Sequence, residues 1–222
     1  MKLYQGDLSP FSARVRMQVY AKDLVGKGIE LASAPGGTGS AQYKAINPTG
    51  KIPALDTGKR VIPESEVICE YIEDVFTAVP LRPADAEGRA QVRLLSRFVD
   101  LYLYPRMSPL YGQLNPATRD AAVVSQGLAS LDEALVLYEQ LLKDGQYQGG
   151  AFAVGDTLTL ADCALVTGFF FINTIMPMFG RSPAFKGFDL LAAYWNAASA
   201  QPVAKRITGE RSVAMAAMMG KQ

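Results

Sequence analysis

Three short segments in the first third of the chain carry residue types that could hold and activate a small anionic ligand. They are Ser-Pro-Phe-Ser at 9–12, Asn-Pro-Thr-Gly-Lys-Ile-Pro-Ala-Leu at 47–55, and Pro-Glu-Ser-Glu at 63–66. Ser9 is a favoured N-cap and Pro10 a favoured first helical residue, so a plain helix start explains the first segment. The chemical alternative uses the same geometry, because a helix N-terminus presents free N–H groups and partial positive charge to an anion such as a thiolate. The Ser9 hydroxyl could donate a hydrogen bond to that anion.

The second segment places Pro53 where a strand should begin. Proline cannot pair normally there unless it lies at a sheet edge or follows a cis peptide bond, and a kinked strand leaves backbone groups free. A peptide laid beside Ile52 could then hydrogen-bond to the chain as an added strand. The alternative is an ordinary loop that contains a proline.

The third segment ends a predicted strand and starts a helix. Ser65 could be the N-cap of that helix. Alternatively, a ligand carboxylate takes the exposed N–H groups and the Ser65 hydroxyl, while Glu64 holds a nearby amine.

The composition excludes several other kinds of site. The chain has no histidine, so it can form no Ser-His-Asp triad, no Cys-His pair and no histidine-ligated metal site, and its two cysteines alone cannot build a structural zinc site. We therefore expect no metal. Lys plus Arg is 22 and Asp plus Glu is 21, so no field of a single sign is available to grip nucleic acid or an anionic membrane. The predicted partner is a small molecule or another protein.

The length and apolar content predict two folded domains. The chain has 222 residues, 49% of them hydrophobic and 19% charged, which is enough to fill real cores. Cys69 and Cys163 fall in apolar helical stretches, so no disulfide is expected. No apolar run of signal-peptide length follows Met1, which predicts a cytoplasmic protein. The apolar region 158–179 is interrupted by polar residues and a proline, which favours a buried helix over a membrane span.

Strands and helices alternate in the first part of the chain. Strands are expected at 2–5, 29–32, 52–56 and 59–62, and helices at 10–25 and 67–75. Thr57-Gly58 is expected to form a two-residue hairpin turn, because glycine tolerates positive φ. This order is typical of a thioredoxin-like α/β domain.

The rest of the chain is predicted to be helical. We assign 1–78 to the first domain, 79–88 to a linker with two prolines, and 89–222 to an all-helical domain. Two long helices are marked by apolar repeats, the first at Leu94, Phe98 and Leu101 and the second at Leu128, Leu131, Leu135, Tyr138 and Leu142. Thr159 and Asp162 form a capping box, with Leu158 and Cys163 as its hydrophobic staple, so the role predicted for Asp162 is structural.

Together the three segments resemble the N-terminal domain of cytosolic glutathione transferases, in order, spacing and residues over 1–76. Residues 9–16 look like the serine-type motif of the tau, theta and zeta branches, and 155–156 with 159–162 are similar to their late capping motif. The resemblance implies a thioredoxin-like N-terminal domain followed by an all-α C-terminal domain. Residues 9–12 are also similar to the Cys-Pro-Tyr-Cys of glutaredoxins, but serine fills both cysteine positions, so this motif cannot exchange disulfides.

The resemblance also implies roles for single residues. Ser9 would donate to the glutathione sulfur, Lys51 would meet the glycine carboxylate, and Ile52 would pair with the cysteinyl backbone just before a cis-Pro53. Glu64 and Ser65 would hold the γ-glutamyl end. The family further implies a homodimer, in which some branches extend an acid toward the partner's site. Asp100 is the candidate for that acid, although a solvated helix face explains it equally well.

Thiol chemistry shows why no histidine is needed. A free thiol with a pKa near 8.5 is only slightly ionised at neutral pH, and the thiolate is the nucleophile. Lowering that pKa by about two units needs roughly 2.7 kcal/mol. A hydrogen bond to a charged acceptor, about 1.5 to 3 kcal/mol, and a helix N-terminus, about 0.3 to 1 kcal/mol, can supply it. Ser12, one turn on, is the rival donor.

A pocket for an apolar electrophile is expected between Ser9 and the long helix of the second domain. Its candidate lining residues are Leu8, Phe11, Tyr102, Met107 and Tyr111, although apolar residues on helices are more often core. The methionines at 215, 218 and 219 could cap that pocket or fray.

The leading prediction is an enzyme that joins glutathione to apolar electrophiles. Within the same family the resemblance also allows a glutathione-dependent isomerase, like maleylacetoacetate isomerase, or a dehalogenase. Phe11 stands where the zeta branch has cysteine, a departure from the isomerase pattern. A hypothesis from another class is a non-catalytic module that binds glutathione, a ligand or another protein, because fold does not fix function.

Overall fold

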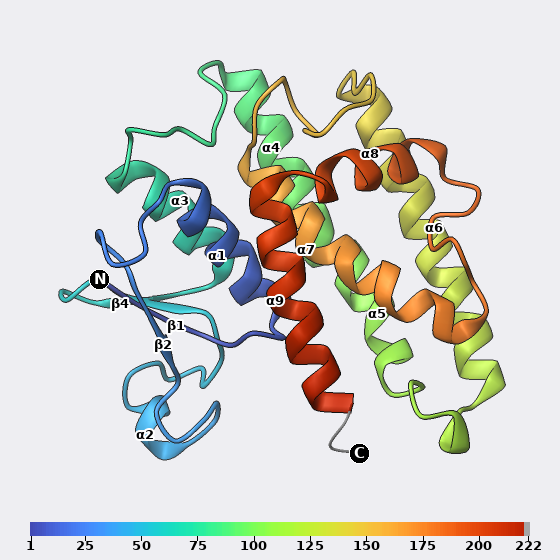
Figure 1. Cartoon of the computed structure of the whole chain (residues 1–222), viewed down its shortest axis with the longest axis horizontal. Coiled ribbons are helices and arrows are strands. Elements are labelled where there is room, and N and C mark those ends of the chain that lie inside the picture. Colours follow the sequence, from blue (N-terminus) through green and yellow to red (C-terminus); the bar gives the residue numbers. More distant parts are fainter. Residues whose placement is uncertain (220–222) are drawn as a thin grey trace. The chain divides into compact units, whose positions relative to one another are not determined.

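The computed structural model describes residues 1–219 and divides the chain into two compact units (Figure 1). The first unit contains residues 1–82 and the C-terminal helix, and the second contains residues 83–201. The first unit holds the strands β1 (Lys2–Gln5), β2 (Glu30–Ser33), β3 (Ala54–Asp56) and β4 (Val61–Pro63) and the helices α1 (Pro10–Ala21), α2 (Ala41–Lys44), α3 (Ser65–Val75) and α9 (Pro202–Met219).

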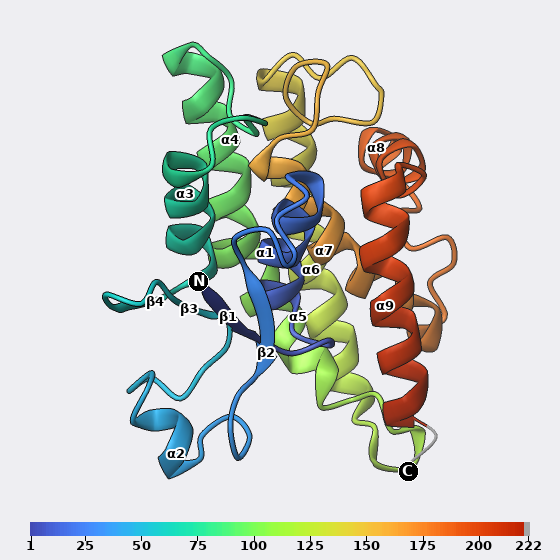
Figure 2. The same cartoon turned by 60° about the vertical axis from the view of Figure 1, so that its left-hand side comes forward.

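The four strands form one sheet in the order β2-β1-β3-β4. Strands β1 and β2 are parallel, with Leu3 opposite Leu31, and α1 makes the crossover between them. The other two pairings are antiparallel. Helices α1 and α3 lie on one side of the sheet and the short α2 on the other in both views (Figures 1 and 2). This arrangement confirms the predicted thioredoxin-like domain, and among the elements of residues 1–82 the sequence pattern did not predict α2.

Helix α1 is buried along most of its length. It ends at Ala21, four residues earlier than predicted, and Asp23 just beyond it has a φ of 53°. Its apolar residues Val15 and Val19, which are one turn apart, are fully buried. The helix also buries four polar residues, namely Ser12, Arg14, Arg16 and Gln18. Each of these must find a polar partner inside the unit.

The hairpin between β3 and β4 has a longer loop than the predicted two-residue turn. Asp56 pairs with Val61, so four residues form the loop. The Thr57 N–H donates to the Arg60 carbonyl at 3.0 Å, and Gly58 has a φ of 81°. The prediction of positive φ at Gly58 is confirmed, and the turn length is wrong because the Thr57 side chain also bonds inside the loop.

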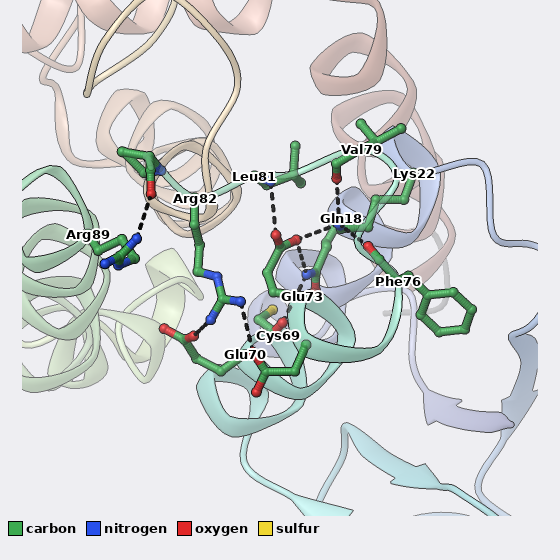
Figure 3. A network of polar contacts seen from close by, with 12 residues as sticks. Gln18, Lys22, Cys69, Glu70, Glu73, Phe76, Val79, Leu81, Arg82 and Arg89 are labelled. Atoms are coloured by element: carbon green, nitrogen blue, oxygen red, sulfur yellow. Dashed lines mark hydrogen bonds and ion pairs between the residues drawn. The ribbon is translucent and has the colours of Figure 1, made fainter. Parts of the chain in front are cut away.

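A buried network holds the segment after α3 against α1 and α3 (Figure 3). Lys22 and Glu73 form an ion pair at 2.8 Å, with side chains 1% and 2% exposed. Lys22 also donates to the carbonyls of Phe76 and Val79, and Glu73 accepts from the Leu81 N–H at 2.9 Å. The residues that lead out of the first unit are therefore fixed by charge-assisted hydrogen bonds.

Helix α9 belongs to the first unit, whereas the sequence analysis placed all of 89–222 in one helical domain. The Tyr20 hydroxyl of α1 donates to Glu210 at 3.0 Å, and Arg16 lies 3.9 Å from the same carboxylate. The Arg206 guanidinium stacks over the Tyr20 ring at 3.6 Å. These partners are far apart in sequence, so periodicity could predict that 202–219 is helical but not where the helix packs.

The second unit is all helical, as predicted. Its elements are α4 (Ala86–Phe98), a π-helical segment (Val99–Leu103), α5 (Tyr104–Tyr111), a 3-10 turn (Pro116–Thr118), α6 (Ala121–Asp144), α7 (Leu160–Ile175), a second 3-10 turn (Met176–Phe179) and α8 (Asp189–Ser199). The repeat predicted for α6 is seen in its buried residues Leu131, Leu135, Tyr138 and Leu142.

Of the repeat predicted for the first long helix, only Phe98 is buried. Leu94 and Leu101 are 45% and 54% exposed, while Val92 and Leu95 of α4 and Val99 of the π-helical segment are buried. The helix passes into the π-helical segment before Pro105. Proline has no N–H and its ring displaces the carbonyl four residues earlier, so the regular hydrogen-bond pattern is interrupted there.

Helix α7 is a core helix. The segment Leu160–Phe179 is long and apolar enough to cross a bilayer by composition, but 83% of its most apolar window is buried inside the protein. It begins with the predicted capping box, in which the Thr159 N–H donates to the Asp162 carboxylate at 2.7 Å. Asp162 is fully buried and also accepts from Ala153 and Tyr194, which supports the structural role predicted for it.

Candidate functional site

An open cavity of about 160 Å³ lies in the first unit, where the loop before β3 meets the start of α3. Its lining residues are Phe11, Thr49, Lys51, Ile52, Pro53, Pro63, Glu64 and Ser65. The cavity thus brings together all the predicted binding residues of the second and third segments. It is smaller than the ~300 to 1,000 Å³ of enclosed ligand pockets, so a ligand here would lie extended and partly in solvent.

Ser9 is the N-cap of α1 and is half-buried. Its Oγ accepts a hydrogen bond from the Ser12 N–H at 3.2 Å, which leaves the hydroxyl proton able to donate elsewhere. Ser9 does not line the cavity itself. Its loop packs against the cavity wall, because a Cβ added at Gly6 would lie 2.7 Å from the Cδ1 of Ile52.

Ser12, the rival donor, is fully buried. Its Oγ accepts from the Gly6 N–H at 3.3 Å and so braces the loop between β1 and α1. A ligand cannot reach a hydroxyl with no exposed surface. Of the two serines, only Ser9 has exposed surface.

Arg16 of α1 also holds the loop between β1 and α1. It is 2% exposed, donates to the Gln5 side chain at 3.0 Å and to the Asp7 carbonyl at 3.2 Å, and pairs with the Asp7 carboxylate. The sequence analysis missed this residue, because a charged residue in a helical pattern is usually assigned to a solvated face. Its position inside the apolar stretch of α1 was the available signal.

The loop before β3 is held by two side chains that sequence reasoning also missed. Asn47 is buried, donates to the Lys51 carbonyl at 2.8 Å and accepts from the Thr49 hydroxyl at 3.1 Å. The Tyr43 hydroxyl donates to the same Lys51 carbonyl at 2.9 Å. Burial raises the pKa of Tyr43, so this hydroxyl stays a donor. Both bonds fix the backbone immediately before Ile52.

The Ile52–Pro53 peptide bond is cis, as the family resemblance implied. Lys51 is exposed, with its charge in solvent beside the cavity. Within residues 1–219 the backbone N–H and C=O of Ile52 belong to no ladder and hold no loop hydrogen bond. An extended peptide could pair with them as an added strand.

Glu64, and not Ser65, is the N-cap of α3. The interpretation of Ser65 as an N-cap is therefore wrong, because the helix begins one residue earlier than that interpretation required. Glu64 has a φ of 69° and a ψ of 116°, is exposed, and makes no side-chain bond to the helix. A non-glycine residue in this region costs about 1 to 3 kcal/mol, and such strain clusters at ligand sites.

Ser65, the first residue of α3, is 5% exposed and lines the cavity. Its Oγ accepts from the Arg14 Nη1 at 3.3 Å, and the same Nη1 lies 3.3 Å from the Glu66 carboxylate. Arg14 is 1% exposed and approaches the Phe11 ring at 5.8 Å. A buried cation therefore lies beneath the end of the cavity formed by the start of α3.

The residues predicted for an electrophile pocket fall in both units. In the first, Leu8 is half-buried in the loop before α1 and Phe11 lines the cavity. In the second, Tyr102 is 43% exposed and stacked on Phe98 at 4.4 Å, Met107 is fully buried, and Tyr111 is half-buried. Their assignment to an electrophile site remains a prediction.

Asp100 and the C-terminal methionines are placed as follows. The Asp100 carboxylate, in the π-helical segment, lies 3.3 Å from Arg97, three residues earlier in α4. Helix α9 continues through Met219, with Met215 buried and Met218 39% exposed, and the Met219 side chain lies outside the described part of the chain.

In residues 1–219 there is no group of three side chains suited to a metal ion. Cys69 and Cys163 are both buried and are not joined in a disulfide.

The fold, a thioredoxin-like domain followed by an all-helical domain, agrees with comparisons to known proteins. Residues 3–80 match the glutathione S-transferase N-terminal domain, and residues 90–202, half of the chain, match the glutathione S-transferase C-terminal domain. The chain belongs to the cytosolic glutathione transferase superfamily.

Its relatives in this superfamily carry two kinds of name. A maleylpyruvate isomerase from Ralstonia sp. is 33% identical over 177 residues, covering 75% of this chain and 79% of the relative. Glutathione S-transferase 3 from Zea mays is 32% identical over 169 residues, 73% of each. A solved holo structure of maleyl pyruvate isomerase, described as a bacterial glutathione transferase in the Zeta class, gives a TM-score of 0.73 at 29% identity, over 93% of this chain and 96% of that one. Membership implies a glutathione-dependent enzyme.

Proposed function

We propose that this protein activates the thiol of glutathione as a thiolate through the Ser9 hydroxyl and joins it to an apolar electrophile. The observation that carries the proposal is the difference between the two serines of α1. Ser9 accepts from the Ser12 N–H and keeps its proton for a ligand, while Ser12 is buried and committed to Gly6. A donor at a helix N-terminus favours the anionic form of a thiol.

The lining of the cavity suits the rest of the glutathione molecule. Ile52 offers a backbone N–H and C=O to the cysteinyl residue, just before Pro53. Lys51 supplies a cation for the glycine carboxylate. Glu64 and Ser65, at the start of α3, would hold the amine and the carboxylate of the γ-glutamyl end.

Isomerisation of a conjugated cis-alkene diacid is the second candidate function. The names of the Ralstonia relative and of the Zeta-class structure favour it. The same thiolate would add to one alkene carbon, the resulting single bond would rotate, and elimination would return glutathione unchanged. Phe11, in place of the cysteine of that branch, favours conjugation instead.

The decisive experiment follows glutathione during turnover. The purified protein is given glutathione with chloro-aromatic, haloalkane, enone and peroxide substrates, and separately with maleylpyruvate and maleylacetone. Loss of one glutathione per product supports conjugation, whereas product formed with glutathione unchanged supports isomerisation. Binding to immobilised glutathione without turnover of any substrate would contradict both and favour the non-catalytic module.

The homodimer, the cytoplasmic location and the electrophile residues stay part of this proposal. Sedimentation of the purified chain tests the dimer. Replacing Tyr111 or Tyr102 by alanine tests the pocket, because loss of electrophile affinity without loss of glutathione affinity is expected there. Unchanged selectivity among electrophiles in both variants would contradict the assignment.

A further inference from the structure

Arg14 is a charged residue with no role in the site as described so far. Its side chain is 1% exposed, and a guanidinium does not give up its proton in a protein, so its positive charge is held inside the first unit. Two of the groups near it, Ser65 and Phe11, also line the cavity. Burying a guanidinium costs desolvation free energy, so we looked for a function of Arg14 at this end of the cavity.

The hydrogen bond from Arg14 determines which way the Ser65 hydroxyl can point. A hydroxyl has one proton and two lone pairs, and a guanidinium can only donate. Since the Ser65 Oγ accepts from Arg14 at 3.3 Å, its proton cannot point along that line. Ser65 finds no acceptor for this proton among the described residues, and the open side of Ser65 is the cavity.

We propose that Arg14 is a positioning residue, which orients the Ser65 hydroxyl as a donor into the cavity toward the carboxylate of the γ-glutamyl end of glutathione. This inference rests on the proposed function, because it presumes that glutathione binds here. Arg14 acts through Ser65 and does not touch the ligand. Without Arg14 the hydroxyl could turn its proton inward, toward Glu66, and present a lone pair to the carboxylate.

The test compares two ligands that differ only in that carboxylate. Glutathione and 4-aminobutyryl-cysteinylglycine, which lacks the carboxylate, are titrated calorimetrically into the full chain. The dissociation constant of the analogue divided by that of glutathione measures how strongly the protein recognises the carboxylate. This ratio does not change if a fraction of the protein is unfolded. We expect Arg14→Gln to lower this ratio about tenfold, through weaker glutathione binding with little change for the analogue. An unchanged ratio overturns the inference.

A double-mutant cycle tests whether Arg14 acts through Ser65. Ser65→Ala should lower the ratio by a similar factor, and adding Arg14→Gln to Ser65→Ala should lower it no further. Independent, multiplying effects would overturn the positioning role and indicate a long-range charge effect instead. If Arg14→Gln does not fold, Arg14→Lys replaces it in the cycle. Lysine keeps the positive charge but lacks the planar set of N–H donors of the guanidinium.

Glu66→Gln is the matched control. It removes the negative charge of the Glu66 carboxylate, which also accepts from the Arg14 Nη1, and leaves the bond to Ser65 in place. The ratio should not fall in this variant, and a fall like that of Arg14→Gln would overturn the inference as general damage to α3. Failure of the parent chain to bind glutathione at all would overturn the proposed function itself, which separates the two outcomes.

Discussion

At the scale of residues, the site depends on which way hydroxyl groups can point. Ser9, Ser12 and Ser65 each accept one hydrogen bond from a donor inside the protein. Only Ser9 and Ser65 keep an exposed side. We therefore propose two roles for the same residue type, a ligand donor where one side is exposed and a brace for the loop where the residue is fully buried.

Ser9→Ala should raise the pKa of the bound glutathione thiol by about two units and remove most of the activity at neutral pH. The expected loss of thiolate stabilisation is roughly 1.5 to 3 kcal/mol, the contribution of a hydrogen bond to a charged group. Affinity for glutathione should change little, because the peptide contacts remain. The thiolate absorbance of the complex, titrated with pH, measures the shift.

Ser12→Ala serves as the comparison for Ser9→Ala. It should lower stability by about 1 to 3 kcal/mol, because the Gly6 N–H loses its acceptor, while the thiol pKa stays that of the parent. The reverse pattern, with a shifted thiol in Ser12→Ala and a normal one in Ser9→Ala, would contradict the assignment.

At the scale of elements, buried polar networks hold α1, α3 and α7 in place. The capping box of α7 is one of them. Burial raises the pKa of the Asp162 carboxyl to about 6, although bonds from Ala153, Thr159 and Tyr194 oppose that rise. The cap thus keeps a carboxyl inside the second unit that titrates within the accessible pH range.

Asp162 should make the second unit less stable as pH rises from about 4 to about 6. The folded state holds a proton there that the unfolded state, with an ordinary carboxyl pKa, has already lost, so unfolding releases it. The free energy of unfolding should fall by roughly 3 kcal/mol over this range from this group alone. Urea unfolding of the parent and of Asp162→Asn at several pH values isolates the contribution of Asp162 to the free energy of unfolding.

The free energy of unfolding plotted against pH should fall more steeply for the parent than for Asp162→Asn. Asp156→Asn is the matched control, because it removes an exposed carboxylate of the same loop without touching the capping box. Parallel profiles for the parent and Asp162→Asn would refute the raised pKa.

The Lys22–Glu73 pair is the second network, and breaking it from one side should be costly. Glu73→Leu leaves the Lys22 ammonium buried without its carboxylate, and we expect a loss of about 3 to 5 kcal/mol. Lys22→Met should cost a similar amount. The double variant should recover much of the loss, because two apolar side chains leave no uncompensated charge. Denaturant midpoints of the four proteins measure this, and purely additive losses would contradict it.

At the scale of the whole molecule, the chain returns at its end to the unit where it began. Helix α9 buries Ala204 and Ile207 and places Glu210 beside Tyr20 and Arg16. Arg16 in turn holds the loop that carries Ser9. The C-terminal helix is thereby connected to the candidate catalytic residue through one buried guanidinium.

A chain that ends at Gln201 should lose about 3 kcal/mol or more of stability in the first unit, since α9 buries Ile207 and Met215 and each such side chain contributes about 1.5 to 3 kcal/mol. Amide hydrogen exchange should show lost protection in α1 and retained protection in α6. Val213→Ala is the control on the same helix, because Val213 is 73% exposed and should change stability by less than about 0.5 kcal/mol. Protection from exchange that is lost in α6 and kept in α1 would contradict the assignment of α9 to the first unit.

The sequence by itself determined the local features. Strand and helix order, the cap at Ser9, the capping box of α7 and the segments at 47–55 and 63–66 follow from periodicity, capping and turn chemistry, which act over a few residues. Where local signals competed, the sequence failed: the hairpin loop was longer than Thr57-Gly58 suggested, and Glu64 took the cap position expected of Ser65.

The tertiary structure decided everything that depends on a buried polar group finding its partner. Arg14 meets Ser65, Arg16 meets Glu210, and Lys22 meets Glu73, in pairs separated by about fifty residues or more. No periodicity predicts such pairs, because a buried charge must be satisfied by whatever segment packs against it. The same reason separates Ser9 from Ser12, since which hydroxyl stays open depends on the loop and strand folded over α1.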